Sequence, residues 1–141
     1  MRLVEIYKSL SDQTRVRILF LLNQQPLCVG NLQRLLQTTQ VNVSKHLAYL
    51  RKRGLVEARR QGQRMVYHLP QEPSRDLELQ LRCLHDCALP EPIFQDDLSR
   101  LEALRSEAGH VVVAQAPSQR RPVGVSEPED RPIWPTEGLV D

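Results

Sequence analysis

Three cysteines are the strongest candidates for chemistry in this 141-residue chain, and two of them, Cys83 and Cys87, are four residues apart. On a helix this spacing places the two Cβ atoms about 6 Å apart on one face. Soft thiolates select soft ions, so this pair, with Cys28 as a third ligand, predicts a trigonal site for As(III) or Sb(III). Zinc would require a fourth ligand, and His85 falls on the opposite side of the same predicted helix.

The same thiols also suit a redox or persulfide-responsive switch, through a disulfide between Cys28 and one of the other two cysteines. A Cys83–Cys87 disulfide within one helix would be strained. Cys28 also fits a purely structural role, because cysteine is often a small buried residue. A thiol oxidoreductase would need Cys-x-x-Cys near a helix start. The spacing here is Cys-x-x-x-Cys, with no nucleophile–base pair, so we expect that the chain is not an enzyme.

Residues 39–67 carry a second pattern, a polar helix followed by a basic hairpin. Thr39 is a suitable N-cap residue, and Val43, Leu47 and Leu50 form one apolar helical face. The other face carries side chains that suit base edges and phosphates. From this helix we expect DNA contacts by Gln40, Asn42, Ser44, Lys45 and His46, the last of which either contacts a phosphate or packs beside Leu50.

A predicted hairpin follows this helix. Gly54 is typical of a helix end, and residues 55–60 and 64–69 predict two strands joined by a turn at 61–63. Arg59, Arg60 and Arg64 surround that turn, where they suit phosphate contacts. Helix, turn, recognition helix and hairpin is the order of a winged helix-turn-helix, which predicts double-stranded DNA as partner. The alternatives are a solvated basic face on an ordinary domain, or a winged helix for protein contacts, which would not need these arginines.

Further helices are expected on both sides of this unit. Helical spacing predicts helices at 2–10, after Asp12 and at 29–36. Ser74 can cap a helix to about residue 88, along which a narrow apolar seam invites a partner helix. That seam consists of Leu77, Leu81, Leu84 and Ala88. We therefore expect a mainly α fold with a small β-hairpin wing and a C-terminal dimerisation helix. Its divisions are a winged-helix and dimerisation domain at 1–90, an additional amphipathic helix at 91–106, and a disordered tail at 107–141.

Charge is distributed unevenly along the chain. Residues 1–70 hold twelve Lys and Arg against three Asp and Glu, whereas residues 71–141 hold seven against fourteen. This asymmetry predicts a nucleic-acid surface on the first half only. No apolar run approaches membrane-spanning length, the N-terminus does not resemble a secretory signal, and three cysteines without a framework pattern suit a reducing compartment. The sequence therefore predicts a cytoplasmic protein with no membrane partner.

Several segments resemble the ArsR/SmtB family of winged-helix repressors, in the family's order and spacing. Residues 7–19 (YKSLSDQTRVRIL) resemble its opening signature, with Gln13 where proline is usual. Residues 27–32 (LCVGNL) and 40–47 (QVNVSKHL) resemble the start of its third helix and its recognition helix, with Val41 where proline is common. The wing matches at Leu55-Val56, Arg60, Gly62 and Val66-Tyr67.

This resemblance covers about residues 3–70 and implies a homodimeric repressor of operator DNA that an inducer releases. The helix at 74–88 would then be the dimer helix. Arsenic-responsive members often carry Cys-Val-Cys at the start of the third helix; here Cys28 occupies the first position and Gly30 the second. We therefore expect As(III) or Sb(III) as the inducer, with no cofactor required for the fold and with the redox or persulfide response as the alternative.

Overall fold

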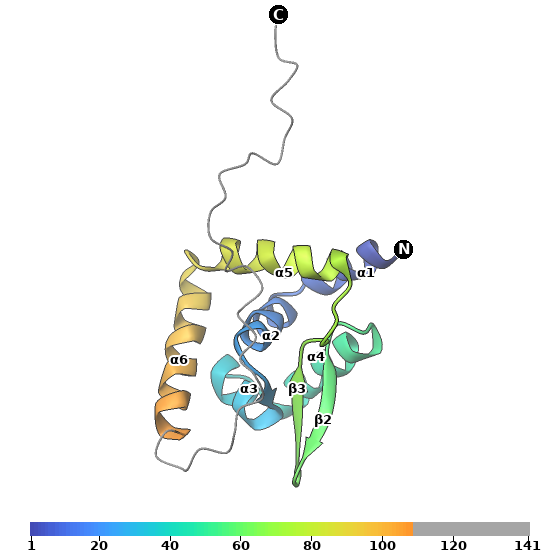
Figure 1. The fold of residues 1–141 in the computed structure, drawn as a ribbon. Coiled ribbons are helices and arrows are strands. Elements are labelled where there is room, and N and C mark those ends of the chain that lie inside the picture. The colour runs from blue at the N-terminus through green and yellow to red at the C-terminus, as the bar shows by residue number, and fades with distance from the viewer. Residues whose placement is uncertain (109–141) are drawn as a thin grey trace, which may run out of the picture.

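The computed structural model describes residues 1–108 and shows a winged helix-turn-helix followed by two further helices (Figure 1). The elements in chain order are α1 (Arg2–Leu10), α2 (Gln13–Gln24), β1 (Leu27–Cys28), α3 (Val29–Leu36), α4 (Gln40–Lys52), β2 (Glu57–Gln61), β3 (Arg64–His68), α5 (Arg75–Ala88) and α6 (Pro92–Ala108). The mainly α fold with a β wing, predicted from the sequence, is confirmed. No helix among residues 1–108 is long and apolar enough to span a membrane.

Side-chain caps start three of the helices where the sequence predicts them. Asp12 accepts a hydrogen bond from the backbone N–H of Arg15 at 3.0 Å and begins α2. Thr39 begins α4 and Ser74 begins α5 in the same way, each accepting from a backbone N–H three residues ahead. These bonds satisfy donors that would otherwise have no partner in the first turn.

Gly54 ends the recognition helix α4 in a left-handed conformation, with φ +71°. Its N–H donates to the carbonyl of Arg51 and the N–H of Leu55 donates to that of Leu50, both at 3.0 Å. These two hydrogen bonds form a Schellman motif, in which glycine avoids the Cβ strain of a positive φ. The chain therefore turns sharply from α4 into the wing, as the sequence predicts.

The wing is a three-stranded antiparallel sheet in the order β1-β3-β2. Strands β2 and β3 form the predicted hairpin, turning at Gly62, which has φ +63°. Strand β1 is an addition to the prediction: Leu27 pairs with Tyr67 and Cys28 with Val66. Two residues are too few to show an alternating pattern, so only the fold reveals this strand.

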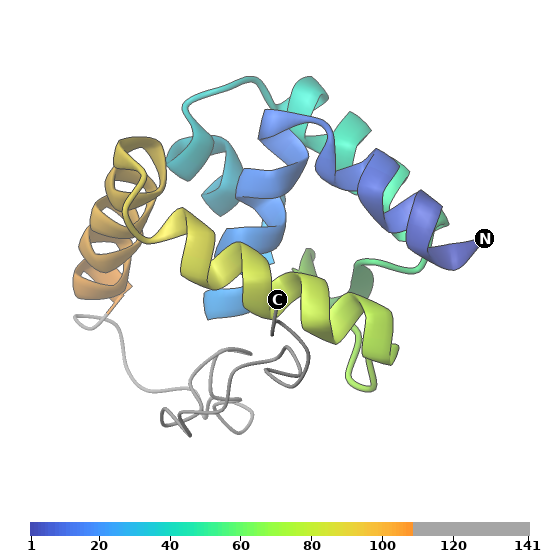
Figure 2. The same cartoon turned by 90° about the horizontal axis from the view of Figure 1, so that it is seen from above.

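The hydrophobic core is centred on α2, whose residues 18–22 are all buried. Helix α5 packs on α1 and α2, at the end of the domain opposite the wing tip (Figures 1 and 2). The apolar seam of α5 meets these helices of its own chain, because Leu77 and Leu81 are each 1% exposed and belong to the core. The expectation that this seam pairs with a second copy is therefore corrected.

Helix α6 packs against α2 and α3. It begins at Pro92 and ends at Ala108, two residues beyond the predicted helix. Asp97 is fully buried, and its carboxylate accepts from both Nε and an Nη of Arg17 on α2. The rest of the expected tail, residues 109–141, lies outside the described residues.

Candidate DNA-binding surface and thiol pair

One face of α4 is buried and the opposite face is exposed. Val43, Leu47 and Leu50 are fully buried, so the helix is oriented as its apolar periodicity predicts. Gln40, Ser44 and Lys45 are exposed. The helix thus presents an amide, a hydroxyl and an ammonium group together, and these groups can donate to base edges and phosphates.

Asn42 lies at the edge of this exposed face and already has a structural contact. Its side-chain amide donates to the hydroxyl of Thr38 at 3.1 Å, and its backbone N–H donates to Thr39. Both bonds hold the turn that precedes α4. Asn42 is partly buried and stabilises the turn, while the rest of its side chain is at the surface. The sequence predicts only the surface role.

The structure places His46 apart from the other predicted contact residues. The side chain is on the core side of α4, where the residue is 8% exposed, and its Nδ1 lies 3.9 Å from a carboxylate oxygen of Asp12. Burial lowers the pKa of His46, and Asp12 only partly offsets this effect. The sequence allows either a phosphate contact or packing beside Leu50. The buried position of His46 agrees with the packing role, so we do not retain His46 among the proposed DNA contacts.

Val41 is a surface residue that the sequence reasoning missed. It is 79% exposed, although valine is apolar. Ser44, Lys45 and Ala48 follow Val41 at i+3, i+4 and i+7, and all three are exposed. This spacing predicts that Val41 lies on the same exposed face of the helix. An exposed apolar side chain among polar neighbours suits the methyl group of thymine.

The wing arginines divide between the two faces of the hairpin. Gln61 pairs with Arg64 and Arg59 with Val66, so Arg59 and Arg64 share one face. Arg60 pairs with Met65 on the other face, and its Nε donates to the carbonyl of Gly62 at 3.3 Å. A duplex lying against one face would therefore meet Arg59 and Arg64 together, whereas Arg60 lies on the other face.

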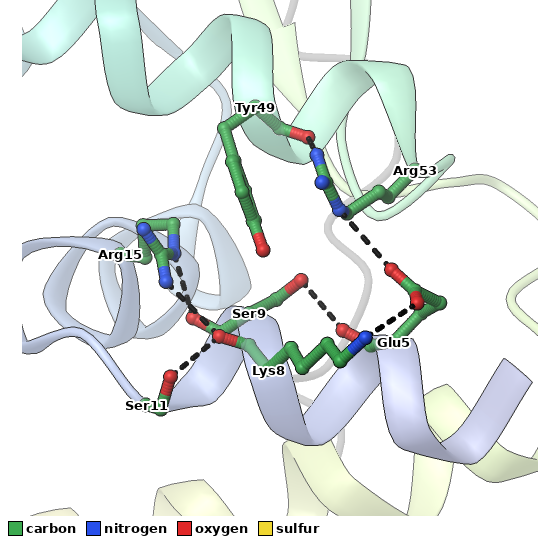
Figure 3. Close-up of polar contacts among 7 residues, drawn as sticks. All are labelled: Glu5, Lys8, Ser9, Ser11, Arg15, Tyr49 and Arg53. Carbon is green, nitrogen blue, oxygen red and sulfur yellow. Dashed lines mark hydrogen bonds and ion pairs between the residues drawn. The ribbon is translucent and has the colours of Figure 1, made fainter.

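The ring of Tyr49 on α4 lies between two guanidinium groups, those of Arg15 and Arg53, at 4.1 and 3.5 Å from its centroid. Arg15 donates to the backbone carbonyls of Ser9 and Lys8 at the end of α1 (Figure 3).

Arg53 pairs with Glu5 of α1 at 3.3 Å. The charge of Lys8, followed by contacts with Arg53, holds the pKa of Glu5 below its usual value.

These contacts tie the C-terminal half of the recognition helix to α1. Cation–π stacking contributes about 0.5–2 kcal/mol for each cation. Arg15 and Arg53 are committed to this cluster, which distinguishes them from the wing arginines. The orientation of α4 therefore depends on α1, the helix that α5 also contacts.

Cys83 and Cys87 lie on adjacent turns of α5, with their sulfur atoms 3.9 Å apart. Both side chains are exposed and both thiols are free. The hydrogen bond with Cys87 raises the pKa of Cys83, and burial and the nearby Cys87 and Asp86 raise it further. The predicted i, i+4 thiol pair is thus present on an accessible surface.

Cys28 is at a different place in the fold. It is the N-cap residue of α3 and lines an open depression of about 480 Å³ with Asn31, Arg34 and Arg64, and with no residue of α5. Within residues 1–108, no three His, Cys, Asp or Glu side chains form a group that could hold a metal ion. One protomer therefore supplies a two-thiol site on α5 and a separate thiol beside the wing.

The family model for bacterial regulatory proteins of the arsR family matches residues 12–58. The arsenical resistance operon repressor of Escherichia coli is 35% identical over 85 residues, which cover 57% of this chain and 73% of that protein. The chain belongs to the ArsR family. This assignment confirms the resemblance seen in the sequence, and the family is one of regulators rather than enzymes.

Two further ArsR-family comparisons agree. The arsenic resistance transcriptional regulator ArsR2 of Pseudomonas putida is 44% identical over 72 residues, which cover 50% of this chain and 63% of that protein. The chain thus spans less than two thirds of this relative's length. The solved structure of HlyU from Vibrio cholerae, a protein named as a transcriptional activator, superposes with a TM-score of 0.56 at 32% identity. It covers 61% of this chain and 90% of HlyU, which confirms the winged-helix fold.

Proposed function

We propose that this ArsR-family protein is a homodimeric transcriptional repressor that binds operator DNA through α4 and the wing. The observation that supports it most is the exposed face of α4, where Gln40, Ser44 and Lys45 surround Val41 while the opposite face is buried. Such a face can enter a major groove, whose base edges carry distinct donor and acceptor patterns.

The contacts divide into two roles. Gln40, Val41 and Ser44 contact base edges, with Asn42 assisting from the edge of the face. Phosphates are contacted by Lys45, Arg59 and Arg64, with Arg60 at the tip. The first group determines the sequence that is bound, and the second supplies most of the salt-dependent affinity.

Dimerisation uses the outer surface of α1 and α5 in this proposal. Met1, Val4 and Tyr7 at α1 and Leu79 on α5 are large apolar side chains that are 43–91% exposed. These two helices are in contact, and the amide of Gln80 donates to the hydroxyl of Tyr7. A symmetric dimer through this surface would bury the exposed side chains and place two recognition helices on half-sites of a near-palindrome.

The inducer in this proposal is a thiophilic metalloid or metal, such as trivalent arsenic, that binds Cys83 and Cys87 in the reducing cytoplasm. The names of relatives such as ArsR2 point to arsenic, and soft thiolates suit that element. Leu79, Cys83 and Cys87 are spaced i, i+4, i+8 along the exposed side of α5. A ligand on the thiols therefore acts at the dimer surface, and a coupling of about 1–3 kcal/mol weakens DNA binding about 5–150-fold.

The test is release of a protein–DNA complex under a phosphine reductant, with trivalent arsenic and antimony compounds added in turn. Wild type and the Cys28→Ser, Cys83→Ser and Cys87→Ser variants are compared. At least one compound should release wild type and Cys28→Ser, while Cys83→Ser and Cys87→Ser stay bound. Failure of every compound to release wild type contradicts the proposed inducer. Release that requires an oxidant and is reversed by reductant would favour the redox or persulfide response.

A further inference from the structure

We propose that Arg100 on α6 is a positioning residue for DNA recognition, because its guanidinium braces the turn between α3 and the recognition helix α4. This inference rests on the proposed function and assigns α6 a role in it. Helix α6 lies beyond residues 12–58, which the family model matches. The brace therefore comes from outside the matched segment.

The turn between α3 and α4 is short and contains a strained residue. Helix α3 ends at Leu36 and α4 begins at Gln40. Gln37, the first residue of the turn, has φ +52° and ψ +47°, and within residues 1–108 it is the one residue other than glycine with a positive φ. This left-handed conformation is unfavourable for a residue with a Cβ unless surrounding contacts hold it. The conformation of Gln37 sets the direction in which the chain enters α4.

Arg100 contacts this turn with both terminal nitrogens of its guanidinium. One Nη donates to the backbone carbonyl of Leu35 at 3.4 Å, and the other donates to the side-chain oxygen of Gln37 at 3.3 Å. The carbonyl of Leu35 is in the last turn of α3, where carbonyl groups have no partner within the helix and a positive charge is favourable. One side chain of α6 thus stabilises both the end of α3 and the left-handed residue that follows it.

The guanidinium of Arg100 is itself held in place by Asp97, three residues earlier on α6. An Nη of Arg100 donates to the carboxylate of Asp97 at 3.2 Å. Asp97 is fully buried and also accepts from Arg17 on the core helix α2. Because the core and Arg17 fix Asp97, the position of Arg100 relative to α2 is fixed as well. These contacts connect the core of the protein to the turn.

The turn leads directly into the end of α4 that is proposed to contact bases. From the side of α4, the amide of Asn42 donates to the hydroxyl of Thr38 in the turn. Gln40 is the first residue of α4, and the N-terminal residues of a recognition helix contact base edges. A shift of the turn therefore moves base-contacting side chains, whereas the wing arginines stay in place. Loss of the Arg100 contacts should reduce discrimination between DNA sequences more than it reduces overall affinity.

The test compares Arg100→Ala and Arg100→Lys with wild type in the full chain, at a temperature at which circular dichroism shows each protein folded. The lysine variant keeps a positive charge beside Asp97 but lacks the fork that reaches two acceptors at once. Binding is measured on a duplex enriched from a random pool and on a shuffled duplex. For both variants we expect the ratio of the two affinities to fall about tenfold, which corresponds to roughly one weakened base contact, with the affinity for the shuffled duplex unchanged.

Arg105→Ala is the matched control on the same helix. The side chains of Arg100 and Arg105 are 32% and 41% exposed, and Arg105 ties α6 to Gln25 at the end of α2 rather than to the turn. Its replacement should leave the affinity ratio unchanged. A second background is Gln37→Gly, since glycine adopts the left-handed conformation without a Cβ penalty. In that background Arg100→Ala should lower the affinity ratio less than it does in wild type.

Amide hydrogen exchange tests the brace without DNA. The N–H of Thr38 donates to the carbonyl of Gln33 at 3.4 Å, so its exchange rate reports on the end of α3 and on the turn. Exchange of this amide should be about tenfold faster in Arg100→Ala, because the turn opens locally more often, and unchanged in Arg105→Ala.

Unchanged exchange of Thr38, or equal effects of Arg100→Ala and Arg105→Ala on the affinity ratio, would overturn the proposal. Equal weakening of both duplexes by Arg100→Ala would also overturn it, because that pattern indicates a general loss of DNA binding rather than a misplaced recognition helix. A wild type that does not discriminate between the duplexes would contradict the proposed function, and the exchange of Thr38 would then decide the brace alone.

Discussion

The carboxylate of Asp97 on α6 accepts two hydrogen bonds from the guanidinium of Arg17 on α2, at 2.8 and 2.6 Å. Asp97 is fully buried, and Arg100 contacts the same carboxylate at 3.2 Å. The bonds to Asp97 raise the pKa of Arg17, so the guanidinium keeps its charge. This pair joins α6 to the helix at the centre of the core.

Replacing Asp97 by Ala should destabilise the fold by about 3–5 kcal/mol, because it leaves Arg17 partly buried without its partner. Urea unfolding measures the effect. The matched control is Glu107→Ala on the same helix, since the Glu107–Arg34 pair is about 60% exposed and exposed pairs contribute about 0–1 kcal/mol. Equal effects of the two variants would contradict a structural role for the buried pair.

Leu79 and Leu81 on α5 provide a matched test of the dimer surface. Leu79→Asp places a charge on the exposed side, so it should yield a folded monomer with weakened operator binding. Leu81→Asp buries a charge in the protomer's own core and should unfold the protein. Sedimentation and circular dichroism distinguish the two outcomes. If Leu79→Asp stays dimeric, the copies meet at another surface.

Alkylation of Cys83 should be slow near neutral pH. Its raised pKa reduces the thiolate fraction, and the thiolate is the reactive form. Because the hydrogen bond with Cys87 is the first cause of that shift, Cys87→Ala should move the pH profile of Cys83 alkylation by iodoacetamide to lower pH. Mass spectrometry of the labelled peptide measures it. An unchanged profile would mean that the two thiols do not interact in solution.

His46 should make the fold sensitive to mild acid. Burial lowers its pKa in the folded protein below the value of about 6.5 that it regains on unfolding. Between these two pKa values the unfolded chain binds the proton more readily, so stability is complete above about pH 6.5 and is lost as the pH falls below it. Urea midpoints between pH 7.5 and 5.5 measure this loss.

The His46→Leu variant should lose less stability over that range, with His68→Leu as the control. Burial opposes the ionisation of Asp12, but hydrogen bonds from the backbone and the charges of His46 and Arg15 lower its pKa overall. The carboxylate of Asp12 therefore remains ionised between pH 7.5 and 5.5. A His46→Leu variant as acid-sensitive as wild type would assign the effect to another group.

Local signals made much of the fold predictable. The helix ends are set by residues that act within one helical turn, namely the caps Asp12, Thr39 and Ser74 and the left-handed Gly54. A short stretch of sequence is therefore enough to predict these helix ends. The exposed face of α4 was predictable for the same reason. Val41 was missed because the sequence prediction assigned it to neither face of this helix.

Contacts between distant segments were not predictable in this way. Strand β1 depends on pairing with residues about forty positions later, and the Arg17–Asp97 pair spans eighty. The seam on α5 showed that it needed a partner helix but not that α1 and α2 of the same chain would provide it. The separation of Cys28 from the α5 thiols likewise follows from the packing of whole helices.

The most direct test of the account is sequence-specific DNA binding by α4 and the wing. Fluorescence anisotropy compares a duplex enriched from a random pool with a shuffled duplex, across several salt concentrations. Gln40→Ala should lose about 1–3 kcal/mol on the enriched duplex only. Arg64→Ala should weaken both duplexes and lower the salt slope by about one unit, and Arg82→Ala on α5 should change neither.

We expect wild type to bind the enriched duplex at least about a thousandfold more tightly than the shuffled one. Equal affinity of wild type for the two duplexes, or full binding by the Gln40→Ala and Arg64→Ala variants, would contradict it.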